Sequence, residues 1–157
     1  MTINLRLILL FILCLIIAAC GFQLRGTVNS DFKSVYIYGG SEGLKNHISK
    51  KFTQAGITIT QKNPEKTIEI LSDKINKRIL SLSRSGSVKE FELVYFTSYR
   101  FKSYDEPWSD EIKKEISRNY TYDDNNRVAK ELEEKNLLQG MRDEIVRAII
   151  SQISVTN

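Results

Sequence analysis

The chain has 157 residues, of which 41% are hydrophobic and 27% charged, and its formal net charge is +4. This length and composition favour one globular domain and exclude collagen-like and low-complexity chains. The small basic excess disfavours a nucleic-acid-binding function, and one histidine beside two cysteines is too few for a structural zinc site with four His or Cys ligands.

Residues 1–19 have the pattern of a signal peptide. The basic residue Arg6 is followed by an apolar run that ends in small residues. The run is about 13 residues long, whereas a transmembrane helix needs about 20. The cleavage region, Ile17-Ala18-Ala19-Cys20, resembles the lipobox of bacterial lipoproteins, in which the cysteine is diacylated and then exposed by cleavage. An ordinary secretory cut after Ala19 is the alternative.

We therefore predict a diacylglycerol and an N-acyl lipid on Cys20 as the only added groups, with no other cofactor. Residues 20–33 would form the lipidated N-terminus and a linker. Each buried acyl CH₂ contributes about 0.8 kcal/mol, so two or three chains anchor a protein durably. Bacterial sorting generally retains lipoproteins with Asp after the cysteine at the inner membrane. Because Gly21 follows here, we expect an anchor in the inner leaflet of the outer membrane and a domain that faces the periplasm.

Residues 34–157 are expected to form a single domain that begins with a strand and a helix. Residues 34–38 are rich in β-branched and aromatic side chains and end at two glycines, which predicts a strand. An amphipathic helix is predicted to follow, with Ser41 as its N-cap and Gly56 just after its end. Residues 57–60 alternate as in a brief strand.

Two long β-rich segments, 67–83 and 88–104, flank the turn Ser85-Gly86-Ser87 and predict a long hairpin. In the second segment, alternate residues from Phe91 to Phe101 share one apolar face. The first segment changes phase: Ile68 and Ile70 lie on one face, whereas Ile75 and Ile79 fall on the other. We therefore expect a β-bulge or a strong twist.

Residues 108–122 alternate as in a further strand, although residues 109–117 also fit one face of a helix. The cluster Asp123-Asp124-Asn125-Asn126 predicts a turn and a helix cap. A last helix should then run toward the C-terminus, and Gly140 within it suggests close packing or a slight bend. Its apolar stripe comprises Val128, Leu132, Leu138, Met141, Ile145, Ile149 and Ile153.

The order of these elements predicts an α+β fold, a two-layer sandwich of one mainly antiparallel sheet of about four strands with two helices packed on one face. The opposite face of the sheet would be free. Tyr, Phe and Ser alternate over the long strands, so this free face is either a binding surface or a solvated one.

No catalytic or metal site is predicted. His47, the only histidine, sits beside the apolar stripe of a helix, and no nucleophile motif of the G-x-S-x-G kind accompanies it. The carboxylate pairs Asp105-Glu106 and Asp110-Glu111 have no surrounding signal of a sugar cleft. The acidic cluster at 123–126 lacks the spacing and the glycine of a calcium loop. The sequence thus favours a protein that is not an enzyme.

Basic residues gather along the expected hairpin, with Arg84 near its tip and Lys89 just beyond. Lys114 and Arg118 fall on the nominally apolar face of the next strand, where an unpaired charge is costly if fully buried. Either they lie at the sheet edge or the predicted register of this strand is wrong. Either these side chains are solvated positions that protect the edge from aggregation, or they meet an anionic ligand.

Three segments of the mature chain form a recognisable set. They are the run Cys20-Gly21-Phe22-Gln23-Leu24-Arg25-Gly26, the hairpin residues 79–83 with Gly86 and Glu90-Phe91-Glu92-Leu93, and the stretch Arg118-Asn119-Tyr120-Thr121-Tyr122-Asp123. In this order they are similar to the LptE family of lipopolysaccharide-assembly lipoproteins. Glu133-Glu134 with Leu137 and Met141 resemble the last helix of the family. Together, these motifs cover essentially the whole mature chain in the expected order.

The resemblance implies a non-enzymatic protein that pairs with the outer-membrane β-barrel LptD. The domain would sit in the lumen of the barrel, assist its assembly and help lipopolysaccharide to reach the outer leaflet. Lipopolysaccharide carries phosphates and acidic sugars, which Lys and Arg side chains recognise. By position in the family pattern, we expect Arg84 and Lys130 to contact it, with Lys114 and Arg118 as further candidates. The alternative function is a lipoprotein subunit of a periplasmic lipid-transport ATPase system.

Overall fold

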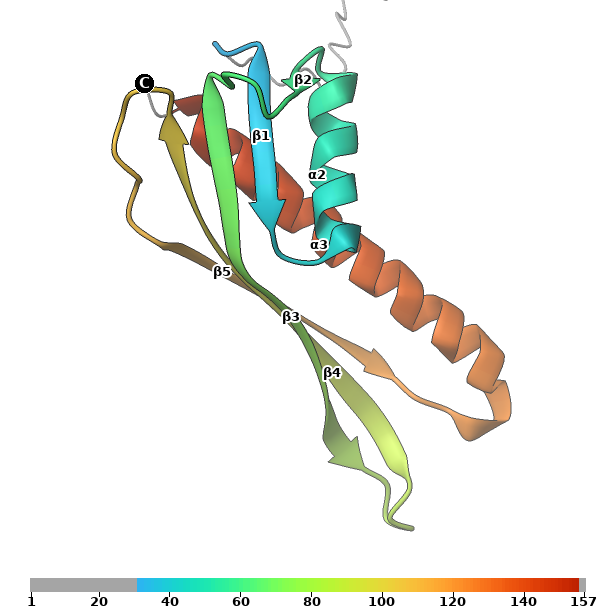
Figure 1. The fold of residues 1–157 in the computed structure, drawn as a ribbon. Helices are drawn as coiled ribbons and strands as arrows, with labels where there is room; N and C mark the ends of the chain where they lie inside the picture. Colours follow the sequence, from blue (N-terminus) through green and yellow to red (C-terminus); the bar gives the residue numbers. More distant parts are fainter. Residues whose placement is uncertain (1–30, 156–157) are drawn as a thin grey trace, which may run out of the picture.

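The computed structural model describes residues 31–155, which form one sheet covered by two long helices (Figure 1). The predicted signal peptide, the lipidation site Cys20 and most of the 20–33 linker lie outside the described residues. Among residues 31–155, no helix is both long and apolar enough to cross a membrane.

The sheet has five strands in the order β2-β1-β3-β4-β5. The long strands β3, β4 and β5 are antiparallel, whereas β1 is parallel to both β2 and β3. Parallel neighbours need a crossover connection, which helix α2 provides between β1 and β2. The predicted α+β class is confirmed, and the strand count exceeds four because β2 forms a two-residue pairing. The strands are β1 (Ser34–Gly39), β2 (Thr58–Ile59), β3 (Lys66–Leu82), β4 (Val88–Ser103) and β5 (Ile112–Thr121).

Both helices begin at the predicted caps. Helix α2 (Glu42–Gln54) starts where the Ser41 hydroxyl accepts a hydrogen bond from the backbone N–H of Leu44, at 3.1 Å. It ends before Gly56, which has a φ of +81°. Asp123 caps the short 3₁₀ helix η1 (Asp124–Asn126), which leads directly into α3 (Arg127–Val155). The cluster at 123–126 is therefore a turn and cap, as predicted.

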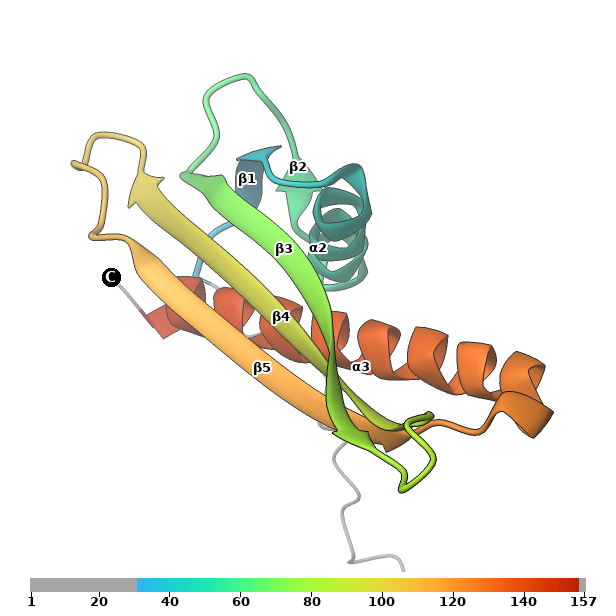
Figure 2. The same ribbon diagram turned by 90° about the horizontal axis from the view of Figure 1, so that it is seen from below.

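The two helices lie on the same side of the sheet (Figures 1 and 2), and the core fills the space between the two layers. They are joined by a hydrogen bond of 2.5 Å between His47 Nε2 and Asp143 Oδ1. The largest fully buried side chains of the helices are Leu44, Ile48, Phe52, Met141, Ile145, Ile149 and Ile153. The sheet contributes Val35, Ile68, Leu93, Tyr95 and Tyr99.

The hydroxyl of Tyr99 is buried in this core and has no hydrogen-bond partner in the described part of the chain. Burial raises the pKa of Tyr99 to about 12. An unpaired buried hydroxyl costs about 1–3 kcal/mol. We therefore expect Tyr99→Phe to raise the free energy of unfolding by about 1 kcal/mol, measured by urea denaturation at pH 7. Unchanged or lower stability would show that the hydroxyl is satisfied.

The expected phase change of β3 is a β-bulge. The register against β4 shifts between Ile70 and Ser72, which leaves Leu71 as the extra residue. Beyond the bulge, Ile75 and Ile79 lie opposite Tyr95 and Phe91. Since opposed residues share a face of the sheet, the bulge returns both isoleucines to the helix side.

The segment at 109–117 forms a strand from Ile112 onward, so the helical alternative is wrong. The start is later than residue 108 because the chain first folds back beside β4. There, the backbone N–H of Ser109 donates to the carbonyl of Phe101 at 2.8 Å, and the Ser109 hydroxyl accepts from the Phe101 N–H at 3.1 Å. Strand β5 is an edge of the sheet, and the edge position expected for Lys114 and Arg118 is confirmed.

The apolar stripe of α3 is buried only in its C-terminal part. The side chains of Val128 and Leu132 are 82% and 59% exposed, because the start of the helix extends past the region that the sheet and α2 cover (Figure 1). At Gly140, an added Cβ would meet no heavy atom within 4 Å in the described structure. The interpretation of this glycine as a close-packing position is therefore wrong.

Candidate functional site

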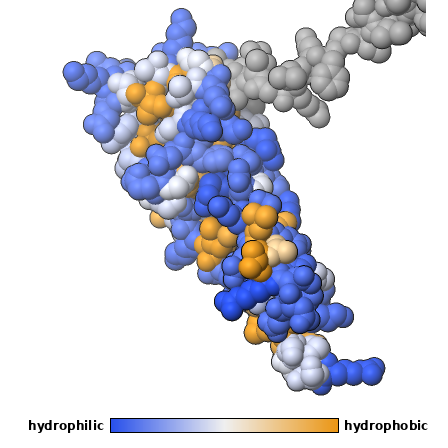
Figure 3. Space-filling view, turned by 90° about the vertical axis from the view of Figure 1, so that its right-hand side faces the viewer, coloured by the Kyte–Doolittle hydropathy of each residue, from blue (hydrophilic) through white to orange (hydrophobic). Residues whose placement is uncertain are grey.

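The far end of the molecule carries many exposed apolar side chains. We call this region the distal arm and define it as hairpin residues 71–89 together with residues 127–134 of α3. Apolar surface is exposed in this half of the molecule, toward the hairpin tip (Figure 3). The large exposed hydrophobic residues of the distal arm are Leu71, Ile75, Ile79, Leu80, Leu82, Val128 and Leu132.

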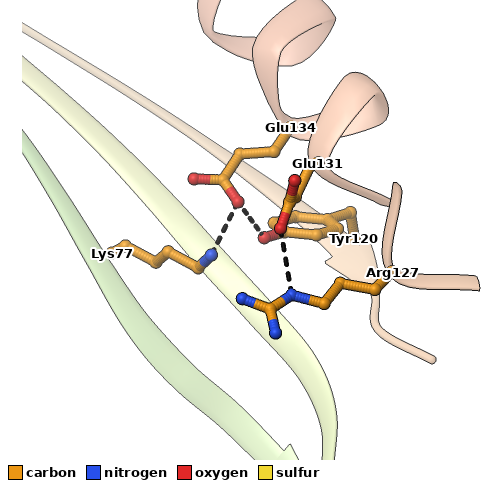
Figure 4. Close-up of polar contacts among 5 residues, drawn as sticks. All are labelled: Lys77, Tyr120, Arg127, Glu131 and Glu134. Atoms are coloured by element: carbon orange, nitrogen blue, oxygen red, sulfur yellow. Dashed lines mark hydrogen bonds and ion pairs between the residues drawn. The ribbon is translucent and has the colours of Figure 1, made fainter. Parts of the chain in front are cut away.

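Glu134 joins the hairpin to the start of α3 (Figure 4). Its Oε2 atom accepts a hydrogen bond from Lys77 Nζ at 2.6 Å and another from the Tyr120 hydroxyl at 2.6 Å. The three residues come from α3, β3 and β5, so this carboxylate fixes the helix relative to two strands. Arg127 and Glu131, drawn beside them, form a separate pair within α3 at 3.0 Å.

An aromatic group supports the Lys77 ammonium. Its nitrogen lies 4.2 Å from the centre of the Phe91 ring, within the range of a cation–π interaction. The Phe91 ring stacks on Tyr120, with centroids 5.7 Å apart, and meets Tyr122 edge-on at 5.2 Å. The base of the distal arm is therefore held by packed rings as well as by charge.

The charges of this cluster stabilise one another. Burial alone would raise the pKa of Glu134, but the hydrogen bonds from Lys77 and Tyr120 outweigh it, so the pKa is lowered. Burial would likewise lower the pKa of Lys77, but the hydrogen bonds with Glu134 and Tyr120 outweigh it, and the pKa is raised. Both residues are thus held in their charged forms at neutral pH.

The lowered pKa of Glu134 predicts an acid-sensitive contribution to stability. It is fully present above the unfolded-state pKa of about 4.3 and is lost as the pH falls through the lower folded-state value. Glu134→Gln should lower the free energy of unfolding at pH 7 by about 1 kcal/mol, after a discount for partial solvent screening. Urea denaturation at pH 7 and pH 3 measures both effects, because the loss should shrink at pH 3.

Glu131→Gln is the matched control. Its pair with Arg127 is largely exposed, so the change should stay within about 0.5 kcal/mol at both pH values. Equal effects of the two variants would contradict the role assigned to Glu134.

Arg84 lies in the turn between β3 and β4 and is exposed to solvent. No hydrogen bond or ion pair of its guanidinium occurs within residues 31–155. The turn is held instead by its neighbours: the Ser83 N–H donates to the Ser87 carbonyl at 2.8 Å, and the Ser83 hydroxyl accepts from the Ser87 N–H at 3.1 Å. Arg84 is therefore a free cation on an ordered tip.

Lys130 is in a different environment. Its side chain is only 19% exposed, and its ammonium is 2.8 Å from Glu133 Oε2 and 3.1 Å from Thr121 Oγ1. Much of its charge is already neutralised by its own helix. An anionic ligand would have to displace or share the Glu133 carboxylate.

Arg118 and Lys114 lie on the edge strand β5. One guanidinium nitrogen of Arg118 donates to the Ser117 carbonyl at 2.8 Å and the other to Glu144 Oε2 at 2.6 Å. Arg118 also lines an open groove of about 510 Å³ between β5 and α3, whose other wall includes Leu132 and Gly140. Lys114 is exposed, opposite Thr97 of β4.

The structure does not bring the four candidate residues into one site. Lys114 is level with Thr97, whereas the hairpin turn follows Leu82 and precedes Val88. Nine residues of β4 separate these levels, which is roughly 30 Å at about 3.3 Å per residue. Arg84 and Lys130 belong to the distal arm, whereas Lys114 lies level with Asp73 at the base of the arm, far from the hairpin turn.

Sequence reasoning missed the cluster of Lys77, Tyr120 and Glu134. Each residue had been assigned to an element, but their contact depends on the register of three strands. The bulge at Leu71 is what places Lys77 opposite Leu93, on the helix side of the sheet. The sequence did contain one signal: Lys77 is a basic residue between Ile75 and Ile79 on the same face of the strand, where apolar side chains are expected.

Comparisons with known proteins agree on one family. The family model described as "LptE: Lipopolysaccharide-assembly" matches residues 32–153. The chain belongs to the LptE family. The family is a non-enzymatic lipoprotein family, and the resemblance inferred from the sequence motifs is confirmed. Among curated proteins, no sequence matches this chain.

Solved structures of lipoproteins share the fold of this LptE-family chain. An uncharacterized lipoprotein B from Nitrosomonas europaea has a TM-score of 0.70 and 32% identity, over 85% of this chain and 90% of that protein. The rare lipoprotein B from Shewanella oneidensis has a TM-score of 0.66 and 21% identity, over 76% and 92%. A minor lipoprotein from Acinetobacter baumannii has a TM-score of 0.60 and 18% identity, over 80% and 92%. The family and these names support an envelope lipoprotein with a role in lipopolysaccharide assembly.

Proposed function

We propose that this LptE-family protein is anchored to the outer membrane through lipid on Cys20 and acts with the β-barrel LptD. In this proposal the domain occupies the barrel lumen, assists barrel assembly and helps to deliver lipopolysaccharide to the outer leaflet. The family match over residues 32–153 carries the proposal. The distal arm supplies the surface on which a partner would be recognised.

The exposed apolar side chains of the distal arm support a protein partner. Large contiguous apolar patches are uncommon on monomeric proteins and mark interaction sites. Leu80 and Leu82 are about half exposed although they lie within β3, which pairs with β4 as far as Leu82. The hydrogen bonds of Glu134 with Lys77 and Tyr120 hold the hairpin and the start of α3 together in the free protein. Little conformational entropy would therefore be lost on binding.

Arg84 is the residue best placed to meet a lipopolysaccharide phosphate. It is exposed and unpaired in the described structure, and a guanidinium can bind phosphate oxygens in a bidentate manner. Lys130 is a weaker candidate because Glu133 already accepts from its ammonium. Arg118 is similarly engaged by Glu144. We therefore place Arg84 first among the four predicted binding residues.

Depletion of the protein in cells tests the proposed function. We expect less correctly folded barrel in the outer membrane and less lipopolysaccharide at the cell surface, measured by gel mobility without heating and by antibody labelling of intact cells. Re-expression of the wild-type chain should restore both. Normal amounts of both after depletion would contradict the proposal.

A further inference from the structure

The free face of the sheet carries a compact group of aromatic and cationic side chains away from the distal arm. We call it the aromatic platform and define it as Tyr36, Tyr38, Arg100, Lys102 and Trp108. The strand register places Tyr36 and Lys102 in one cross-strand row and Tyr38 and Arg100 in the next. All five side chains are partly exposed, and the helices lie on the other side of the sheet (Figure 2).

The rings of the platform are held in a fixed arrangement. Tyr36 and Tyr38 stack with centroids 5.5 Å apart, and Trp108 meets Tyr38 edge-on at 6.4 Å. The Arg100 guanidinium lies 4.6 Å and the Lys102 ammonium 5.3 Å from the centre of the Trp108 ring. Trp108 comes from the loop before β5, which is fastened to β4 through Ser109.

The two cations differ in how they are paired. Arg100 donates to Glu69 Oε2 at 2.6 Å, so its position is fixed by a carboxylate of the neighbouring strand. Lys102 forms no ion pair with any carboxylate of residues 31–155. The platform therefore presents one uncompensated positive charge beside three aromatic rings.

The core of the protein does not need this arrangement. The buried cluster lies between the sheet and the helices and includes none of the three rings. Within residues 31–155, no helix covers these three large aromatic side chains, and the neighbouring lysine has no ion pair. They form a surface suited to a ligand that has both apolar faces and negative charge.

We propose that the aromatic platform binds a saccharide that carries phosphate or carboxylate groups. The C–H faces of sugar rings pack on flat aromatic side chains, and Lys102 would bind the anionic substituent through a charge-assisted hydrogen bond. Arg100, held by Glu69, would position the Trp108 ring. The origin of this saccharide rests on the proposed function, because the phosphorylated sugars of lipopolysaccharide have this chemistry.

The single tryptophan gives a direct measurement. Trp108 is the only tryptophan of the chain, so its fluorescence reports on the platform alone. The full lipoprotein in detergent would be titrated with three probes: a phosphorylated core oligosaccharide released from lipopolysaccharide, the same oligosaccharide after dephosphorylation and reduction of its carboxylates, and a soluble peptidoglycan fragment that carries carboxylates. We expect saturable changes with the two charged probes and weak or absent changes with the neutralised oligosaccharide. The tighter of the two charged probes identifies the source.

Lys102→Gln tests the charge. It should weaken binding of the phosphorylated oligosaccharide at least about tenfold, measured by calorimetry so that altered Trp108 fluorescence does not bias the result. The matched control is Lys113→Gln, on the same face, whose ammonium is already 3.6 Å from Glu111. It should leave the affinity unchanged. Thermal unfolding of both variants checks that the fold is retained.

Several outcomes would overturn the proposal: no saturable binding of either charged probe, undiminished binding of the neutralised oligosaccharide, or equal effects of the two lysine variants. Loss of barrel co-purification in Tyr38→Ala without any saccharide binding would instead assign the platform to a protein contact, which also overturns it. Barrel recovery without saccharide binding leaves the proposed function intact. Saccharide binding without barrel recovery contradicts the proposed function alone.

Discussion

Replacing Phe52 by alanine is expected to lower the free energy of unfolding by about 3–5 kcal/mol, the range for buried Phe→Ala changes. The Phe52 side chain is fully buried in the last turn of α2, and its ring meets Phe32 edge-on with centroids 5.9 Å apart. Phe52 belongs to the buried core cluster, together with Phe32, Val35 and Leu44. Urea denaturation followed by circular dichroism measures the change.

Val128→Ala is the control for this prediction. Val128 is also an apolar residue on a long helix, but it is almost fully solvent-exposed. Its truncation should change the free energy of unfolding by less than about 0.5 kcal/mol. If Phe52→Ala lowered the free energy of unfolding no more than Val128→Ala does, α2 would not be packed on the sheet as described.

Replacing Leu80 and Leu82 together by serine is expected to reduce barrel recovery at least about tenfold while the free chain keeps its stability. Both side chains are about half exposed on the distal arm. Covering each one with a partner would contribute about 1 kcal/mol from removal of apolar surface, and 1.4 kcal/mol corresponds to a tenfold change in affinity. Affinity purification with quantification of the barrel measures the effect.

A double variant at the opposite end of the molecule is the matched control. Ile59→Ser and Tyr104→Ser also remove exposed apolar side chains, but from β2 and the β4–β5 loop. Barrel recovery should be unchanged in this variant. If both double variants lose the barrel equally, or if neither does, the distal arm is not the recognition surface.

Much of the fold was predictable because its signals are local. The caps at Ser41 and Asp123, the left-handed Gly56 and the alternation in β4 each depend on neighbouring residues only. The parallel placement of β1 was not predicted. The direction of β1 relative to β3 depends on the path that the chain takes through α2 and back to the sheet. The periodicity of apolar residues does not specify that path.

The site was predictable only in part. Family motifs pointed to Arg84, and the structure places it at an exposed tip. The extent of the distal arm was missed, because Val128 and Leu132 continue the apolar stripe of α3 in the sequence although nothing in the described chain covers them. The partners of Lys130 and Arg118 also could not be read from periodicity, because contacts such as Arg118 with Glu144 join different elements.

The most direct test of the central proposal is an affinity purification of the tagged lipoprotein from detergent-solubilised outer membranes, with the co-purifying protein identified by mass. We expect one large β-barrel, LptD, recovered in about equal amount. Recovery of inner-membrane transport subunits instead, or of no partner at all, would contradict the proposed function. Recovery of the transport subunits would favour an accessory lipoprotein of a lipid-transport ATPase.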